Sequence, residues 1–389
     1  MTTKDFRQDI AGYTDILKEI EVCRKYGQDY RLGKGKWLEY VERIHPSKVK
    51  LKVMDIIEES SQVKTLRLVS PTNSLPPFLA GQYINLFLDI AGVRTSRPYS
   101  ISSSPAQRAY YDITVGRIKE GFVSDYLLDK VVVGDVFEAS SPTGNFYYNP
   151  LFHGNDLVFI AGGTGITPFM SMIREVLDRG IQRKIHLFYG ANTLEEAFFN
   201  DELLAKAKKF SNFKYDLVIS NPPADYDGLK GLIDGKLIKE ELDDINRKTF
   251  YVCGPTAMYE FCLPELERLG IPRKRIRREV FSLAGNIVNA PAWPKEVNAH
   301  QEFAVNIKEG PHKDQTIKAK ASEPLVIAME RAGIPVPTSC RSGECSLCRV
   351  KVLSGQVFES SSHVRKSDRD NGYVHACSAY PVSDLEILL

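Results

Sequence analysis

The stretch that decides the architecture is Cys340-Arg-Ser-Gly-Glu-Cys345-Ser-Leu-Cys348, and a further cysteine, Cys377, follows it along the chain. These are four of the seven cysteines in the sequence. An odd number of cysteines, in a chain whose first residues lack the apolar core of a secretory signal, argues against a disulfide framework. The local crowding therefore predicts a metal site.

The spacing of these cysteines, C-x4-C-x2-C with a distant fourth, is that of plant-type [2Fe–2S] ferredoxins. Two irons need four thiolates, and three of them must come from one short loop, which Gly343 and its small neighbours allow to curl. A structural zinc site would instead use two C-x2–4-C knuckles. We expect a [2Fe–2S] cluster in an α+β, ferredoxin-like (β-grasp) domain over residues 301–389, with the ligands Cys340, Cys345, Cys348 and Cys377.

The residues upstream of this domain alternate between strand and helix patterns. Apolar runs at 157–161, 185–189, 215–220 and 249–253 predict strands, and 169–178, 195–210, 237–241 and 258–269 predict helices. Such alternation is typical of a parallel sheet in a doubly wound α/β domain. We place that domain at residues 151–282 and an interdomain linker, aperiodic and proline-containing, at 283–300.

The preceding region has a different pattern. Short β-type runs at 51–57, 63–69, 83–90, 110–118 and 135–139 are separated by Gly, Pro, Asn and Ser. This spacing predicts an antiparallel β-barrel over residues 49–150. Residues 1–48 form a helical N-terminal extension, because Ile16, Leu17, Ile20 and Cys23 repeat with helical spacing, as do Trp37, Tyr40, Val41 and Ile44. These two helices either pack on the body of the protein or dock a partner.

The composition excludes several classes of protein. With 43% hydrophobic residues among 389, the chain can fold into two or three domains and is not a disordered chain. A net charge of +2 gives no footprint of nucleic-acid binding. No stretch approaches the roughly 20 apolar residues of a membrane helix. We therefore expect a cytoplasmic protein without a transmembrane segment, and the oligomeric state stays open.

The barrel region carries Arg97-Pro98-Tyr99-Ser100 at the end of a strand, and this segment resembles the R-x-Y-S/T motif of the ferredoxin–NADP reductase superfamily. The resemblance implies that Arg97 holds a flavin phosphate, that Tyr99 lies beside the isoalloxazine ring, and that Ser100 lies near its N5. A second segment is similar to the family's G-x-V/L-S, which begins a helix whose amides hold the pyrophosphate. The implied flavin contacts are Arg97, Pro98, Tyr99, Ser100, Gly121, Phe122, Val123 and Ser124, and FAD is favoured over FMN.

The glycine-rich turn after the first parallel strand resembles the family's nicotinamide loop, and a Cys-Gly-Pro segment resembles its hydride-transfer site. By this resemblance Cys253 joins Tyr99 and Ser100 as a catalytic residue, and an aromatic residue near the flavin ends the domain. The implied contacts are Gly163, Thr164, Gly165, Thr167, Pro168, Cys253, Gly254, Pro255 and Phe281. No Arg or Lys occurs between Lys184 and Lys206, where a 2′-phosphate would bind, so NADH is favoured over NADPH.

The combination of sites implies an NAD(P)H-dependent oxidoreductase of the ferredoxin-reductase type. NADH delivers two electrons as hydride, whereas a [2Fe–2S] cluster accepts one at a time, so a flavin is expected between them. The expected route is NADH to FAD to [2Fe–2S] to a partner protein, such as an oxygenase, a demethylase or another redox protein. The alternative is an electron-entry or regulatory subunit of a fixed redox complex.

Overall fold

The computed structural model describes residues 12–25, 39–42, 44–71, 75–119, 121–281, 287–361 and 364–389. The chain divides into two units, Met1–Ser47 and Lys48–Leu389. The first unit contains the helix α1 (Tyr13–Lys25), where the sequence predicts one, and residues 39–42 and 44 are also helical. No residue of α1 is buried. Trp37, part of the second predicted helix, lies outside the described residues.

The second unit begins with a six-stranded antiparallel sheet in the order β4-β3-β6-β1-β2-β5. A bridge between Ile101 and Ile113 joins the two edges, so that the sheet curls into the predicted barrel. Apolar side chains on its inner face, such as Leu66, Ile84 and Leu86, are fully buried. The strands are β1 (Lys48–Ser60), β2 (Val63–Val69), β3 (Tyr83–Ile90), β4 (Val93–Ser100), β5 (Tyr111–Gly116) and β6 (Val136–Ser140).

Strand β4 carries the Arg97–Ser100 segment and ends at Ser100, as expected of a motif at a strand end. Pro98 lies within this strand, opposite Asn85 of β3. Proline cannot donate a ladder hydrogen bond, so it is tolerated in a sheet only where one side of the strand is unpaired. The edge position of β4 meets that condition. After β5 the chain enters the helix α3 (Phe122–Asp129), with Gly121 as its N-cap residue.

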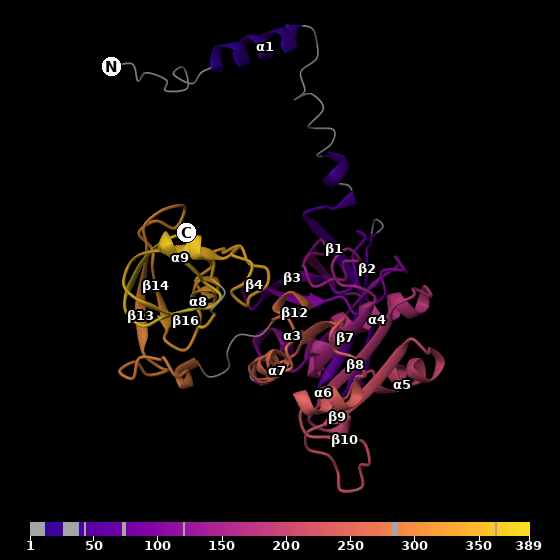
Figure 1. The fold of residues 1–389 in the computed structure, drawn as a ribbon. Helices are drawn as coiled ribbons and strands as arrows, with labels where there is room; N and C mark the ends of the chain where they lie inside the picture. Colours follow the sequence, from indigo (N-terminus) through magenta and orange to yellow (C-terminus); the bar gives the residue numbers. More distant parts are fainter. Residues whose placement is uncertain are drawn as a thin grey trace, which may run out of the picture. The chain divides into compact units, whose positions relative to one another are not determined.

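The middle of the unit is a six-stranded parallel sheet in the order β10-β9-β8-β7-β11-β12, flanked by helices (Figure 1). This confirms the doubly wound α/β prediction. The strands are β7 (Asp156–Gly162), β8 (Lys184–Ala191), β9 (Phe213–Ile219), β10 (Leu229–Lys230), β11 (Thr249–Cys253) and β12 (Ile276–Glu279). The α-helices are α4 (Thr167–Asp178), α5 (Asn200–Lys209), α6 (Gly235–Glu241) and α7 (Thr256–Arg268), with 3-10 turns η2 (Gly163–Ile166), η3 (Leu194–Glu196) and η4 (Arg273–Arg275).

The C-terminal part folds as a five-stranded mixed sheet, β14-β13-β19-β15-β17, beside a two-stranded sheet, β16-β18. Its α+β content agrees with the expected ferredoxin-like fold. The strands are β13 (Glu302–Ile307), β14 (Thr316–Lys320), β15 (Arg349–Ser354), β16 (Val357–Glu359), β17 (Tyr373–His375), β18 (Ala379–Pro381) and β19 (Leu385–Leu388). The helices are α8 (Leu325–Arg331) and α9 (Lys366–Asp370).

The segment interpreted as a linker contributes to this last fold. It contains the 3-10 turn η5 (Ile287–Asn289), and Trp293 is buried in a small core with Phe303 and Tyr380. The Trp293 indole donates a hydrogen bond of 2.8 Å to the carbonyl of Val297. Residues 287–297 therefore pack onto the C-terminal fold. Among the described residues, no helix is long and apolar enough to cross a membrane.

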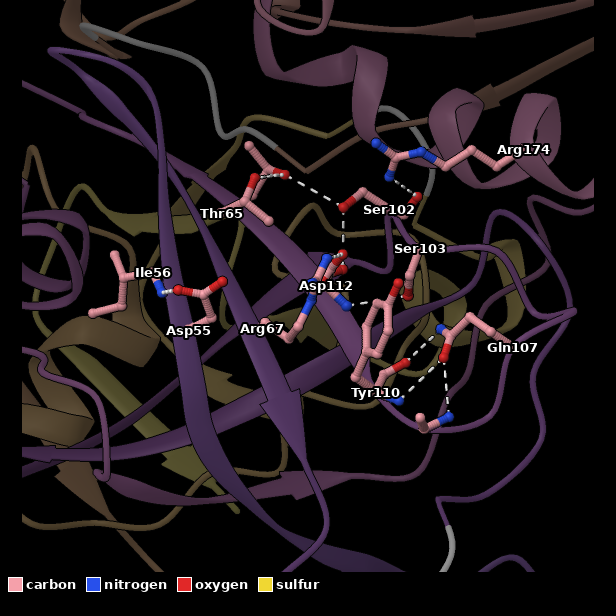
Figure 2. Close-up of polar contacts among 12 residues, drawn as sticks. Asp55, Ile56, Thr65, Arg67, Ser102, Ser103, Gln107, Tyr110, Asp112 and Arg174 are labelled. Atoms are coloured by element: carbon pink, nitrogen blue, oxygen red, sulfur yellow. Dashed lines mark hydrogen bonds and ion pairs between the residues drawn. The ribbon is translucent and has the colours of Figure 1, made fainter. Parts of the chain in front are cut away.

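A polar joint fixes the barrel against the parallel-sheet region just after Ser100. The Ser171 hydroxyl, on α4, donates a 2.7 Å hydrogen bond to the Ser103 carbonyl. Arg174, one turn further along α4, donates a 2.8 Å hydrogen bond to the Ser102 carbonyl (Figure 2). Its guanidinium also forms a two-pronged ion pair with Glu202 of α5.

The same loop is tied to the barrel. The Ser102 amide donates to the carbonyl of Asp112, and the Asp112 amide donates to the Ser103 hydroxyl oxygen (Figure 2). The Asp112 carboxylate is held in turn by both arms of the Arg67 guanidinium, at 2.9 Å each. Ser100 is thus continuous with a loop that is anchored on two sides.

We expect Arg174→Met to destabilise the folded chain by about 2 kcal/mol, because a charged donor to a buried carbonyl and its carboxylate pair are both lost. The urea midpoint for loss of structure, followed by circular dichroism, should fall. Arg179→Met, on the same helix but half exposed and paired only with Glu175, is the matched control. Equal midpoints for the two variants would contradict this account of the joint.

Candidate functional site

A cavity of about 620 Å³ gathers the motifs that the sequence singled out. It is lined by residues from the end of β4, the start of α3, the turns after β7 and β11, and the segment after β12. The sequence-predicted residues in its wall are Arg97, Pro98, Tyr99, Ser100, Gly121, Phe122, Val123, Ser124, Thr164, Thr167, Gly254, Pro255 and Phe281. Segments separated by more than 180 positions in the sequence therefore meet in one place.

The cavity also has a wall from the C-terminal fold. Val326 and Ile327 of α8, Arg341 of the cysteine loop, and the cysteine Cys377 line it. This places an expected cluster ligand at the surface of the expected flavin site. Residues of the barrel that the sequence-based site omitted, Thr114, Gly116, Arg117 and Ile118, complete the lining.

Four sequence-predicted residues, Gly163, Gly165, Pro168 and Cys253, are not in the cavity wall. Gly165 has a packing role instead, because a Cβ atom there would lie 2.2 Å from the Cys253 carbonyl oxygen. Its glycine lets the turn after β7 contact the end of β11 directly. Pro168 lies in the first turn of α4, where its missing N–H costs no helical hydrogen bond. These residues shape the nicotinamide loops from behind.

The phosphate end of the cavity is defined by Arg97 and the N-terminus of α3. Arg97 donates 2.7 Å hydrogen bonds from one nitrogen, Nη1, to the Thr95 hydroxyl and the Ser96 carbonyl. Burial, followed by the positive charge of Arg341, lowers the pKa of Arg97 to about 10. The guanidinium is still charged at neutral pH. Unsatisfied amides at a helix N-terminus, here beginning at Phe122, add positive potential for an anion.

The ring end of the cavity contains aromatic and small polar side chains. The Tyr99 side chain is half-buried in the cavity wall, and desolvation raises the pKa of its hydroxyl, so it stays neutral. Ser100 is buried beside it. Phe281 meets Tyr83 edge to face, with ring centroids 5.4 Å apart. The arrangement fits a planar ring system between Tyr99 and Phe281, as the resemblance implies.

Behind the nicotinamide loops lies a cluster of buried titratable groups. The Tyr259 hydroxyl accepts a 3.0 Å hydrogen bond from the Gly254 amide, contacts the Cys253 thiol, and donates to the Glu279 carbonyl. Burial raises the pKa of the Cys253 thiol and of the Glu279 carboxyl, so both are neutral. Oε2 of Glu279 has no hydrogen-bond partner among the described residues. The sequence pointed to the segment of Glu279 but did not include its carboxyl in the site.

The four cysteines of the C-terminal fold are arranged as two pairs, Cys340 with Cys345 and Cys348 with Cys377, each joined by a thiol hydrogen bond. The bond from Cys345 lowers the pKa of the Cys340 thiol, and the bond from Cys377 lowers the pKa of the Cys348 thiol. In the described part of the chain, no three His, Cys, Asp or Glu side chains converge as a single metal ion would need. Two pairs of thiols fit two irons with two protein ligands each.

The backbone around these cysteines also fits a cluster. The amides of Ser342 and Cys345 both point at the Cys340 sulfur, at 3.4 Å. Gly343 has a φ of +81°, and a Cβ atom there would lie 2.6 Å from Ser361 and Ser378, so glycine is required for the loop to curl. Amides directed at sulfur tune the potential of such clusters.

A buried histidine supports the loop from below. His375 is fully buried, and its Nδ1 lies 2.6 Å from the carbonyl of Gly343, while its Nε2 lies 3.1 Å from the Asp368 carboxylate. The carboxylate fixes the ring so that the carbonyl of Gly343 can accept a hydrogen bond from Nδ1. No spacing in the sequence relates these three residues, and the sequence did not identify them as a unit.

Comparison with known proteins agrees with this arrangement. Three family models match the chain in order: the oxidoreductase FAD-binding domain at residues 48–148, the oxidoreductase NAD-binding domain at 159–263, and the 2Fe-2S iron-sulfur cluster binding domain at 310–382. The site therefore defines a class, the oxidoreductases that carry FAD-binding, NAD-binding and [2Fe–2S] domains in one chain.

Several of the similar proteins are reductase components of monooxygenases. The ferredoxin reductase component of 3-ketosteroid-9-alpha-monooxygenase from Rhodococcus rhodochrous is 30% identical over 88% of this chain and 97% of its own length. The glycine betaine monooxygenase reductase subunit of Pseudomonas aeruginosa is 26% identical over 87% of this chain and 94% of its own. The solved structure of phthalate dioxygenase reductase covers 88% of this chain and 97% of its own, with a TM-score of 0.67 at 23% identity.

The chain belongs to the family of oxidoreductases with FAD-binding, NAD-binding and [2Fe–2S] domains that includes the ferredoxin reductase component of 3-ketosteroid-9-alpha-monooxygenase. It is an oxidoreductase with FAD, NAD and [2Fe–2S] sites, as the sequence predicted. The extension before residue 48 lies outside all three family models.

We expect Cys377→Ala to remove the cluster, because one iron loses half of its protein ligands. Iron in the purified protein, about two atoms per chain for a [2Fe–2S] site, should fall close to zero while flavin binding persists. Cys262→Ala is the matched control, since Cys262 is a buried cysteine on α7, outside the C-terminal fold, and its thiol donates to the Ile233 carbonyl. Full iron content in Cys377→Ala would rule out this ligand assignment.

Proposed function

We propose that this chain oxidises NADH and passes the electrons one at a time to a separate oxygenase or demethylase component. One observation carries the proposal: the turns after β7 and β11 line the same cavity as Cys377. The turns assigned to nicotinamide binding and a ligand of the cluster therefore line one cavity that is large enough for a flavin. The relatives named above, reductase components of monooxygenases, support an oxygenase as the partner class.

When bound, the flavin supplies the ability to accept two electrons and release them singly, and the cluster supplies the exit to a partner protein. The residues of the chain supply position and environment. Arg97 and the N-terminus of α3 hold the phosphate, and Tyr99 and Phe281 confine the ring. The neutral Cys253 and Glu279 offer a polar but uncharged surface behind the nicotinamide loops, where water has little access.

The preference for NADH rests on where the cations lie. The 2′-hydroxyl of the nucleotide is read at the carboxyl end of β8, near Asn192. Arg183 precedes the other end of this strand, about 30 Å from Asn192 for nine extended residue steps, and stacks on Tyr148. The turn Arg273–Arg275 also precedes its parallel strand, β12, at the amino end of the sheet. Neither supplies a partner for a 2′-phosphate.

Anaerobic titration of the purified protein tests the reaction. NADH should bleach the flavin and the cluster absorbance together, and NADH should give a kcat/KM at least about tenfold above that of NADPH with a dye as acceptor. A protein that is not reduced by either nucleotide would overturn the proposed function. A preference for NADPH would overturn only the nucleotide assignment and would direct attention to Lys230, two strands from Ala191 in register.

Cys253 provides a second test. Cys253→Ala should slow reduction of the flavin by NADH about tenfold, because the turn after β11, which lines the cavity, loses the buried thiol that packs behind it and orients the nicotinamide less well, while flavin and iron contents are unchanged. Stopped-flow spectroscopy under anaerobic conditions measures this step. Cys262→Ala controls for loss of a buried thiol in the same sheet region. An unchanged rate in Cys253→Ala would remove this residue from the catalytic set.

A specific observation favours a second candidate, membership of a fixed redox complex. Helix α1 exposes Ile16, Leu17 and Val22, at 55%, 43% and 55% of their surface. Exposed apolar side chains on an amphipathic helix are typical of a docking element. Deleting residues 1–47 should then abolish co-purification with the partner and leave dye reduction intact. If the deletion variant still co-purifies with the partner, the fixed complex is ruled out and the separate-component function is the remaining candidate.

The same proposal places the protein in the cytoplasm. All seven cysteines are free of disulfide bonds, which accords with a reducing compartment.

A further inference from the structure

A buried polar network connects the cysteine loop to the barrel at the phosphate end of the cavity. The Thr95 hydroxyl, on β4, donates a 2.9 Å hydrogen bond to the Glu330 carboxylate, at the end of α8. The same hydroxyl oxygen accepts hydrogen bonds from Arg97, at 2.7 Å, and from Arg341, at 3.2 Å. Arg341 also forms an ion pair with Glu330. Thr95 thus brings two guanidinium groups from different parts of the chain to one oxygen atom.

The charges in this network do not balance. Arg97 and Arg341 are two cations, and among the described residues Glu330, which pairs with Arg341 and accepts from Thr95, is the one carboxylate bonded within this network. The side chains of Arg341 and Glu330 are 6% and 8% exposed, so water screens little of the surplus charge. A buried cation without a counter-charge is strongly unfavourable. The network can therefore accommodate an anion at the wall of the cavity, which both Arg97 and Arg341 line.

Arg341 is also incompletely bonded. Its Nη2 serves Glu330 and Thr95, but its Nε, although buried, has no hydrogen-bond partner among the described residues. The side chain lines the same cavity as Arg97. The backbone of Arg341 has a φ of +54°, a conformation that residues other than glycine rarely adopt, so the loop holds this arginine in a fixed position.

We propose that Arg341, in the cysteine loop, is a second guanidinium for the phosphate of the flavin nucleotide. This inference rests on the proposed function, in which the cavity binds flavin. Guanidinium groups match phosphate oxygens in charge and geometry, and the free Nε supplies a further donor. One flavin nucleotide is then held by the barrel, through Arg97, and by the iron–sulfur fold, through Arg341.

A consequence is that flavin binding and docking of the iron–sulfur fold are linked. A phosphate that contacts both parts stabilises their docked arrangement, and by reciprocity the docked arrangement raises the affinity for phosphorylated flavins. Riboflavin, which lacks the phosphate, should bind without this linkage. The difference between riboflavin and FMN therefore isolates the contribution of the phosphate.

The test uses the full-length chain, freed of flavin but retaining its cluster. Riboflavin, FMN and FAD are titrated against it, and flavin fluorescence gives each Kd. Arg341→Gln should lower the ratio of the riboflavin Kd to the FMN Kd at least about tenfold, and should weaken FAD similarly. Arg341→Lys, which keeps the charge, should restore part of the ratio.

Arg331→Gln is the matched control. Arg331 lies beside Glu330 on α8, but it pairs with Glu323, is half exposed and does not line the cavity. The ratio should stay at the wild-type value in this variant. If Arg341 serves only as the ion-pair partner of Glu330, Arg341→Gln will weaken riboflavin and FMN equally, and that result overturns the inference. Failure of the wild-type chain to bind any flavin would overturn the proposed function instead.

Hydrogen exchange of the wild-type protein decides the question even where Arg341→Gln loses its cluster. Saturation with FMN should slow amide exchange in residues 339–346 more than saturation with riboflavin. Equal protection by the two flavins would overturn the inference.

Discussion

The structure depends on a line of hydrogen bonds between the cysteine loop and the barrel. Ser339, directly before Cys340, shares its hydroxyl with the Tyr83 hydroxyl at 2.8 Å and with the Asn85 amide at 3.2 Å. Thr338 meets Ser96 of β4 at 2.8 Å. Each bond is modest in water-exposed surroundings but stronger when buried, and together they fix one orientation of the loop. Because Cys377 lines the flavin cavity, this orientation also sets the approach of the cluster to the flavin.

The sequence predicted the layered architecture because hydrophobic periodicity is a local property. Val63–Val69 and Tyr83–Ile90 are strands with the predicted limits, and Thr249–Cys253 is as well. The strand β4 was not predicted as a separate run, since Val93–Ser100 is rich in polar residues and contains a proline. Its strand conformation comes from pairing with β3 along its whole length, and pairing across a sheet is not encoded in one segment alone.

The candidate site also contains features that are local in the sequence and features that arise only from contacts between distant segments. The motif residues were identifiable because the chemistry of each is contained in four or five consecutive positions. Arg341 and Thr95 are separated by 246 positions, and Glu330 and Thr95 by 235, so their contact exists only in the folded chain. His375 and Asp368 are close in the sequence and contact each other. Their role in supporting the cysteine loop arises from the contact of His375 with Gly343, 32 positions away. Sequence reasoning could assign ligands but not the groups that orient them.

The cavity has two functional walls, and this explains why three domains occur in one chain. Thr164, Gly254 and Pro255 line one side of the cavity, which the proposed function assigns to the nicotinamide, and Val326 and the cysteine loop line the side of the cluster. Entry and exit of electrons can then use different walls without exchange of a carrier. If the flavin phosphate is also shared between the barrel and the cysteine loop, loss of flavin would loosen the cluster side first. A chain without flavin would then not present its cluster in the docked position, which limits electron loss to unintended acceptors.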